Sequence, residues 1–173
     1  GEIRDIDTAE TAIQAALTGH LLFTTLHTND AAGTIARLVA LGAKPSNISS
    51  ALNIIVAQRL VKKVCKNCAS FGKISKANLE KIKKELRGVK IKNFKISPSI
   101  KIASIRGCKL CNLAGFRGRV GIFEILLVTD NIKKNILKNP SITELNGAAV
   151  KEGMVTMRQD GFIKVIEGIT TIG

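Results

Sequence analysis

The feature that most constrains the fold is a short apolar run that ends in a cluster of small polar residues. Residues 21–26 read LLFTTL, and the only two histidines, His20 and His27, stand on either side of them. The run is too short for a helix of its own and predicts a buried strand. In open α/β sheets the functional site lies just past the carboxyl ends of the strands. The residues that follow the run, His-Thr-Asn-Asp, are therefore a candidate site.

A second group of charged residues precedes this run. The chain opens with GEIRD, which contains Glu2, Arg4 and Asp5 and reads as the end of another buried strand. A carboxylate at one strand end and a histidine at a neighbouring strand end suit the phosphates of a magnesium-bound nucleotide. The carboxylate would hold the metal or position water, and the imidazole would sense the terminal phosphate. A carboxylate beside an arginine should also stay ionised.

The order of the predicted elements indicates an α/β fold. Apolar residues at helical spacing predict a first helix capped by Asp5 or Asp7 and a second capped by Asn29 or Asp30. Residues 46–56 have helical character with Ser46 as the cap, and residues 54–64 are a passage from helix to strand. An alternation of strands and helices predicts a parallel sheet covered by helices.

The second half of the chain changes in character. Residues 71–104 are Lys-rich, with a helix predicted from Ser75 to Leu86 and weak strands over 90–105. A Gly/Arg-rich turn is predicted over 115–121, where Arg117 and Arg119 either hold the turn or reach the phosphates of a neighbouring subunit. After it, the pattern predicts a strand over 120–128 and helices over 129–137, 141–152 and 156–167.

The four cysteines form two Cys-x-x-Cys pairs, Cys65 with Cys68 and Cys108 with Cys111, separated by 39 residues. The gap is longer than that of a usual zinc ribbon. Two such knuckles still complete a tetrahedral shell of four thiolates, and we predict a structural zinc site; two disulfides or free thiols are the alternatives. Nearby lysines would offset the charge of the tetrathiolate: Lys62, Lys63, Lys66 and Lys109.

The net charge of +14 comes mostly from lysine and makes nucleic acid, anionic lipid and phosphate ligands candidate partners, with a merely solvated lysine surface as the alternative. The chain has no Trp or Tyr, which weakens the case for nucleic-acid binding because bases stack on aromatic rings. Its 45% hydrophobic and 3% aromatic content predicts an aliphatic core. No apolar run approaches the roughly 20 residues that span a bilayer.

Several segments together carry a family resemblance. Five stretches resemble the Walker B, histidine-box and following segments of the ATPases that power type II secretion and type IV pilus assembly: GEIRD, TGHLLFTTLHTNDA, AQRLVKKVCKNC, GCKLCNLAGFRGRVGIFEIL and EGMVTMRQDGFIKVIEGITT. The resemblance implies the C-terminal half of a RecA-like parallel sheet covered by helices, with an inserted zinc module and a C-terminal helical segment. The implied domains are 1–63, the ATPase core; 64–119, the zinc module; and 120–173, a strand and helices packing on the core.

The resemblance also implies roles for single residues. Glu2 would lie near the magnesium and the attacking water, and His27 would contact the γ-phosphate; these two are the predicted catalytic residues. Glu2 could instead simply lead a helix, and His20 could serve only the backbone. The remaining predicted nucleotide-binding residues are Arg4, Asp5, His20 and Thr28, and the predicted zinc ligands are Cys65, Cys68, Cys108 and Cys111.

The implied protein is a cytoplasmic homo-hexamer peripheral to the inner membrane, with ATP, Mg²⁺ and Zn²⁺ as ligands, a membrane platform protein as partner and no nucleic acid. The phosphate-binding loop GxxxxGK[ST] does not occur in this sequence. We therefore expect a truncated chain that does not hydrolyse ATP by itself. A non-enzymatic zinc-ribbon module that binds nucleic acid through its lysines is the rival interpretation, but it leaves GEIRD and TGHLLFTTLHTND unexplained.

Overall fold

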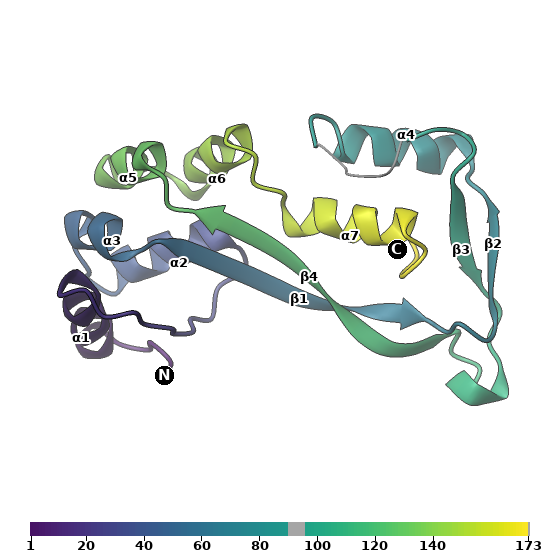
Figure 1. The fold of residues 1–173 in the computed structure, drawn as a ribbon, viewed down its shortest axis with the longest axis horizontal. Helices are drawn as coiled ribbons and strands as arrows, with labels where there is room; N and C mark the ends of the chain where they lie inside the picture. Colours follow the sequence, from purple (N-terminus) through teal and green to yellow (C-terminus); the bar gives the residue numbers. More distant parts are fainter. Residues whose placement is uncertain (90–95, 173) are drawn as a thin grey trace. The chain divides into compact units, whose positions relative to one another are not determined.

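The computed structural model describes residues 1–89 and 96–172 and has a mixed α/β fold (Figure 1). The chain divides into two compact units: unit 1 comprises residues 1–57 and 124–154, and unit 2 comprises residues 58–123 and 155–173. Two long strands, β1 (Ile54–Val64) and β4 (Phe116–Leu127), pair as a two-stranded sheet, and the chain passes from one unit to the other within each of them. The predicted division into three consecutive parts remains a prediction.

Unit 1 contains five helices whose beginnings follow local capping rules. Asp5 accepts a hydrogen bond from the backbone N–H of Thr8, and Asp30 accepts one from that of Gly33. The third helix is capped by Lys44, two positions before the predicted cap Ser46, because Pro45 occupies its first turn. It ends at Ala51, so residues 54–56 of the predicted helical stretch belong to a strand instead. The helices are α1 (Ile6–Leu17), α2 (Ala31–Ala40), α3 (Pro45–Ala51), α5 (Asp130–Leu137) and α6 (Ile142–Lys151).

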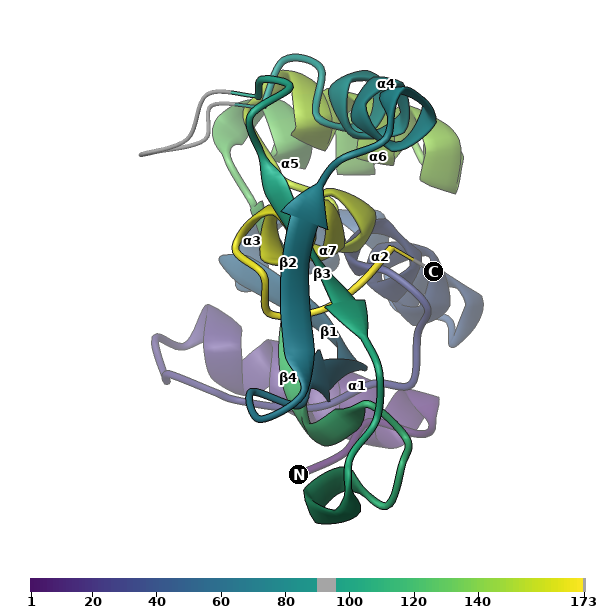
Figure 2. The same ribbon diagram turned by 90° about the vertical axis from the view of Figure 1, so that its right-hand side faces the viewer.

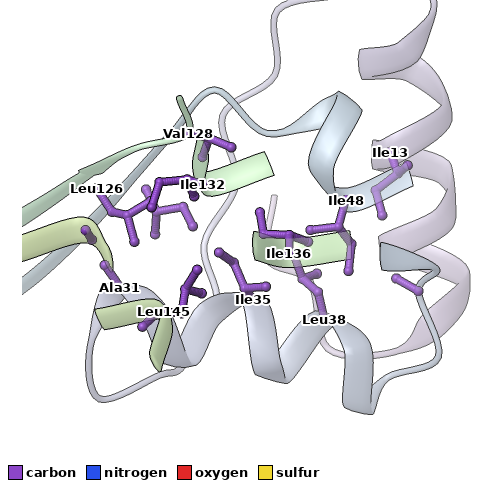
Figure 3. Close-up of a cluster of buried hydrophobic side chains, with 14 of the residues drawn as sticks. Ile13, Ala31, Ile35, Leu38, Ile48, Leu126, Val128, Ile132, Ile136 and Leu145 are labelled. Atoms are coloured by element: carbon purple, nitrogen blue, oxygen red, sulfur yellow. The ribbon is translucent and has the colours of Figure 1, made fainter. Parts of the chain in front are cut away.

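The core of unit 1 is aliphatic, as the composition predicts. Ile48 of α3, Leu126 of β4 and Ile132 of α5 are almost completely buried (Figure 3). They lie among Ile35 of α2 and Leu145 of α6, so helices from both ends of the chain share one hydrophobic cluster. Burial of each such side chain stabilises the fold by about 1.5–3 kcal/mol.

The prediction of a buried strand over residues 21–26 is wrong for the described structure. Leu21 and Phe23 are 79% and 81% exposed, and the segment is extended without regular pairing. Its one ladder contact is an isolated parallel bridge between Thr25 and Glu2. A strand of a parallel sheet is buried only when strands on both sides and helices on both faces cover it. Within residues 1–89 and 96–172, the only segment that pairs with this run is Gly1–Ile3, on one side.

Unit 2 contains a second pair of strands, β2 (Ala69–Lys73) and β3 (Lys101–Ile105), which run antiparallel and lie side by side (Figure 2). Ala69 pairs with Ile105 at one end and Lys73 with Lys101 at the other. The cysteine knuckles adjoin the first end, because β2 begins after Cys68 and β3 ends before Cys108. The prediction of weak strands over 90–105 is confirmed for β3, while residues 90–95 lie outside the described part.

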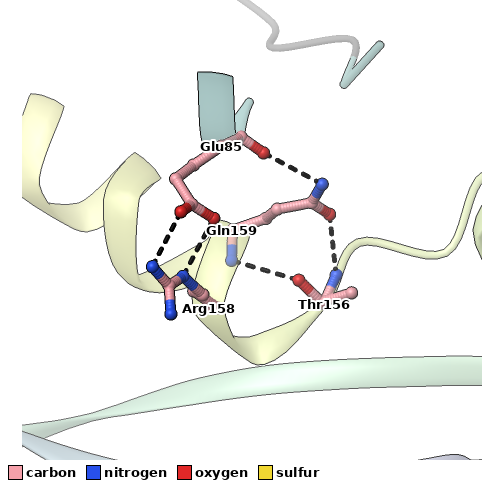
Figure 4. A network of polar contacts seen from close by, with 4 residues as sticks. All are labelled: Glu85, Thr156, Arg158 and Gln159. Carbon is pink, nitrogen blue, oxygen red and sulfur yellow. Dashed lines mark hydrogen bonds and ion pairs between the residues drawn. The ribbon is translucent and has the colours of Figure 1, made fainter. Parts of the chain in front are cut away.

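Two helices cover this ribbon, α4 (Lys76–Glu85) and α7 (Met157–Ile166). Their small core consists of Ile82, Leu86, Ile100, Phe162, Val165 and Ile166. The Arg158 guanidinium donates to both carboxylate oxygens of Glu85 at 2.9 and 2.7 Å, and Gln159 donates to the Glu85 carbonyl at 3.1 Å (Figure 4). Thr156 and Gln159 form a capping box at the start of α7. One polar network thus joins the end of α4 to the beginning of α7.

The predicted Gly/Arg-rich turn over 115–121 is wrong, because β4 begins at Phe116 and runs through this stretch. Gly118 adopts a positive φ of 79° inside the strand, a conformation that glycine adopts without steric cost. Gly118 therefore allows β4 to continue through an irregular backbone conformation and does not end the strand. The predicted strand over 120–128 and the three predicted C-terminal helices are confirmed as β4, α5, α6 and α7.

Candidate functional site

The first candidate site is built on the bridge between the chain's first residues and Thr25. The Ile3 N–H donates to the Thr25 carbonyl at 3.0 Å, and the Thr25 N–H donates to the Gly1 carbonyl at 3.1 Å. Ile3 is buried in the core of unit 1, whereas the neighbouring Glu2 is only partly buried, as expected for an extended chain whose side chains alternate between faces. The bridge brings the segment that carries Glu2 beside the segment that ends at His27.

Both oxygens of the Glu2 carboxylate have cationic or polar partners. Its Oε1 lies 3.0 Å from Nε2 of His27, and its Oε2 accepts a hydrogen bond from Nη2 of Arg4 at 2.6 Å. Hydrogen bonding to Arg4, together with the charges of Arg4 and His27, lowers the pKa of Glu2 below its ordinary value, and the same bond raises the pKa of Arg4. Glu2 is therefore an ionised carboxylate at neutral pH, as predicted from the sequence.

These side chains line an open hollow of about 430 Å³, together with Ile3, Leu26 and Arg37. The sequence analysis missed Arg37. It lies in the last turn of α2, where a basic residue ordinarily interacts with the helix dipole, so its sequence position alone gives no sign of a site. The hollow combines one carboxylate, one imidazole and two guanidinium groups. Such a set is suited to bind an anion and to hold a polarised water molecule beside it.

Three other predicted nucleotide-binding residues are engaged in local structure and do not line the hollow. Asp5 caps α1, and this hydrogen bond from the Thr8 backbone lowers the pKa of Asp5. Nδ1 of His20 lies 3.1 Å from the Thr18 hydroxyl, just past the end of α1. The Thr28 hydroxyl lies 2.9 Å from that of Thr34. Contacts of Asp5, His20 and Thr28 with a nucleotide remain predictions.

A buried carboxylate that the sequence analysis did not single out also supports the site. Glu124 of β4 is 3% exposed, and its Oε1 accepts a hydrogen bond from the Ala31 N–H at 2.9 Å. Ala31 is the first residue of α2, and Asp30 caps the same helix end through Gly33. Two carboxylates thus satisfy orphan N–H groups at the helix end that directly follows His27. The sequence separation of 93 positions between Ala31 and Glu124 hides this contact from local sequence patterns.

The second candidate site is the group of four cysteines in unit 2. All four Sγ atoms lie within 4.8 Å of one another, and all four thiols are free. The separations are 3.9 Å for Cys65–Cys108, 3.8 Å for Cys68–Cys111 and 3.7 Å for Cys108–Cys111. A tetrahedral zinc ion with Zn–S bonds of about 2.3 Å separates its sulfurs by about 3.8 Å. The predicted ligands therefore come together with the spacing that a four-thiolate metal site needs.

Backbone groups favour the thiolate form of one of the cysteines, Cys111. The N–H groups of Cys108 and Gly115 donate to Sγ of Cys111 at 3.2 and 3.3 Å. Burial acts to raise the pKa of Cys111, but these donors outweigh it and lower that pKa to about 7, whereas burial raises the pKa of Cys68 to about 12. Gly107, at φ +86°, is required at the second knuckle, because a Cβ there would lie 2.4 Å from the Leu113 carbonyl oxygen.

Comparisons with known proteins relate the whole chain to one family. Residues 1–173 match the family model described as Type II/IV secretion system protein. The type IV pilus assembly ATPase PilB of Thermus thermophilus is 42% identical over 172 residues, covering 99% of this chain and 18% of the relative. Type II secretion system protein E of Pseudomonas aeruginosa is 41% identical over 172 residues, covering 99% of this chain and 32% of the relative.

A solved structure shares the fold. The X-ray structure of the Legionella pneumophila ATPase DotB matches 99% of this chain and 35% of its own chain, with a TM-score of 0.61 and 22% sequence identity. This likeness confirms the predicted fold class. The chain spans about a fifth to a third of the length of these relatives. No helix within residues 1–89 and 96–172 has the length and apolar character of a membrane span.

The Glu2–Arg4 contact leads us to a prediction about the protonation of Glu2. Because Arg4 depresses the pKa of Glu2, the stabilisation from this contact is present above the ordinary carboxyl pKa and is lost as the pH falls through the lowered value. We expect Arg4→Met to raise the pKa of Glu2 toward its ordinary value, as measured by NMR titration of the side-chain carboxyl carbon. Arg37→Met is the matched control, and an equal shift in both variants would contradict a specific Arg4 contact.

The contact between Glu124 and the Ala31 N–H leads us to a prediction about the stability of the start of α2. Glu124→Ala leaves a buried N–H without its acceptor and should lower the free energy of unfolding by about 1–3 kcal/mol. Glu124→Gln keeps an acceptor oxygen and should lose less. Hydrogen exchange at the Ala31 amide should rise in the alanine variant and stay near the original rate in the glutamine variant. Glu10→Gln, on the exposed face of α1, is the control; equal protection of Ala31 in all three variants would refute the role.

Proposed function

Because the chain belongs to the type II/IV secretion system protein family, we propose that it is part of a hexameric ATPase that powers type II secretion or type IV pilus assembly. The observation that carries the proposal is the 3.0 Å contact between Glu2 and His27 across the parallel bridge. It joins the two residues to which the family resemblance gives catalytic roles. The names of the relatives, a pilus assembly ATPase and a secretion protein E, support the same class of function.

In the proposed mechanism Glu2 orients the attacking water and His27 donates a hydrogen bond to the terminal phosphate. Arg4 keeps Glu2 ionised, and Arg37 adds a second positive charge to the hollow. Positioning and charge neutralisation supply most of the rate acceleration in phosphoryl transfer, so groups that act only by their placement are sufficient for these roles. Nucleotide contacts by Asp5, His20 and Thr28 are a further part of the proposal.

The residues of the hollow fit Mg²⁺ better through water than directly. Mg²⁺ binds through one or two carboxylates, substrate phosphates and several retained waters. Glu2 is the only carboxylate that lines the described hollow, and Arg4 and His27 already engage its two oxygens. Bound Mg²⁺ would neutralise charge on the phosphates. Glu2 would then accept a hydrogen bond from one of its waters, with Arg4 retained.

We further propose Zn²⁺ as the metal of the four cysteines, since the sulfur spacing and the N–H donors to Cys111 fit a tetrahedral thiolate site. The proposed place of the protein is the cytoplasm, at the inner membrane, with a platform protein of the secretion or pilus machine as partner. Nucleotide-driven motion in the hexamer would act on that partner. The proposed domain division is 1–63, 64–119 and 120–173.

The rival, a nucleic-acid-binding zinc module, explains the charge and the cysteines only. It assigns no role to the contact between Glu2 and His27. Binding to one nucleic-acid sequence in preference to others, at physiological salt, would favour the rival, whereas salt-sensitive binding to any sequence is expected of a chain with a net charge of +14.

The catalytic proposal predicts kinetic effects in the full-length protein. Glu2→Gln removes the charged acceptor of the water and should lower kcat by roughly 100-fold or more, with a smaller effect on KM for ATP. His27→Ala should also lower kcat. Asp7→Asn, on α1 and outside the hollow, is the control. ATP hydrolysis by the 173-residue chain alone should be undetectable, and a normal kcat in Glu2→Gln would refute the assignment.

The zinc proposal predicts a local effect of metal removal. Zinc should be bound with one ion per chain, as measured by elemental analysis, and contributes on the order of 10 kcal/mol to the folding of its module. Chelation, or Cys65→Ser with Cys108→Ser, should increase hydrogen exchange in β2, β3 and the knuckles. The helices α1, α2 and α3 of unit 1 serve as the internal control. Unchanged exchange around the cysteines after verified metal loss would refute a structural role.

A further inference from the structure

The net positive charge of the chain comes from one of its two units. Unit 2 contains 20 Lys and Arg residues and 4 Asp and Glu residues, a net charge of +16, whereas unit 1 contains 7 and 9, a net charge of −2. The excess is therefore a property of one unit and not of the chain as a whole. The charge therefore belongs to the cysteine-containing unit, and it calls for a reason that is specific to that unit.

The four acidic residues of unit 2 belong to its two helices and to the end of one of them. Glu80 and Glu85 belong to α4, Asp160 belongs to α7, and Glu167 caps the end of α7. Three of them form ion pairs, with Lys83, Arg158 and Lys164. These carboxylates stabilise the helical end of the unit. Among the described residues, no ion pair involves a cation of the cysteine knuckles.

The knuckles carry an open hollow of about 490 Å³ lined by three of these cations, Lys63, Lys66 and Arg117, and by no carboxylate. Val64, Asn67 and Leu110 complete most of its wall. Leu110 is 59% exposed, and Leu113, which follows on the same knuckle, is 75% exposed. Apolar side chains within a basic rim are a common composition of protein interfaces, where an apolar centre is surrounded by charged residues.

Neutralisation of the metal site does not account for this surface. Four thiolates around a divalent metal carry about two negative charges, far fewer than the excess of 16 positive charges in the unit. Nor does it account for the exposed leucines, since an apolar side chain in water gives no electrostatic benefit. A ligand that supplies both negative charge and apolar contact accounts for both observations.

We propose that this basic knuckle surface, defined as Lys63, Lys66, Leu110 and Arg117, binds an acidic polypeptide segment of a partner protein. The carboxylates of the segment would pair with Arg117 and the two lysines, and an apolar side chain would cover Leu110. Arginine binds a carboxylate with two parallel hydrogen bonds, which gives the contact a defined geometry. The binding does not require ATP hydrolysis, so the surface and the proposed ATPase activity can fail independently.

The shape and composition of the surface favour a polypeptide over the other polyanions. Single-stranded nucleic acid binds by stacking its bases on aromatic rings, but the chain has no Trp or Tyr. The ring of Phe116, next to Arg117, is partly buried and lies under Lys62, whose Nζ is 5.7 Å from the ring centre. A bilayer presents a broad, nearly flat array of headgroups, whereas a concave site is best filled by side chains that project from a chain.

The test measures binding of a short fluorescent peptide, rich in Glu with interspersed Leu, to the zinc-loaded full-length protein at physiological salt. Fluorescence anisotropy should show saturable binding that the Gln-for-Glu peptide does not reproduce. Lys63→Glu with Lys66→Glu should weaken binding by roughly tenfold or more, because it replaces attraction with repulsion at the site. Leu110→Ser should weaken it several-fold without changing the net charge.

The matched control is Lys73→Glu with Lys101→Glu, which makes the same charge change on the paired strands β2 and β3 of the same unit. It should weaken binding by only about twofold, since exposed charges at a distance are screened. Zinc content and thermal unfolding should be equal in all variants. The proposal would be overturned if the peptide did not bind, or if the two double variants lost equal affinity. It would also be overturned if anionic vesicles or nucleic acid bound more tightly than the peptide and this binding depended on Lys63 and Lys66.

Discussion

The geometry of the proposed nucleotide site depends on one short backbone contact, the parallel bridge between Glu2 and Thr25. Two hydrogen bonds make the bridge, and such bonds contribute only about 0.5–1.5 kcal/mol each. The bridge is therefore stable only because both of its segments are fixed elsewhere. Ile3 is buried in the core of unit 1, and the segment after His27 leads directly into the capped start of α2. Placement of the carboxylate beside the imidazole is thus a consequence of core packing.

The start of α2 is in turn fixed by a residue from the second half of the chain. Glu124 is buried beside the core residue Leu126 on the same strand and accepts the Ala31 N–H. A buried carboxylate is costly unless it is hydrogen-bonded, and the positive end of a helix is a favourable place for it. The site consequently needs β4 to form, although β4 lies almost a hundred residues beyond His27. This dependence makes Glu124 a positioning residue and not a catalytic one.

The local parts of this structure could be predicted from sequence, and the parts that depend on distant neighbours could not. Caps such as Ser75 and Thr129 act within four residues, and the helices they begin were predicted correctly. The apolar run at 21–26 was expected to be buried, but burial depends on what covers a strand. The contacts of Glu124 and Arg37 carry no local signal, whereas the regular spacing of the four cysteines predicted their meeting.

Unit 2 combines a thin core with a large charge of one sign, and both features lower its stability. Among the described residues, six buried side chains form the core between α4, α7 and the paired strands, while 16 excess positive charges repel one another. The available carboxylates are used at the helices, so the cysteine end has no comparable protein compensation. A bound metal would hold that end together by covalent-like bonds to four ligands. Repulsion among the cations beside it would lower the stability of the free protein, and binding of the acidic segment proposed above would offset that repulsion.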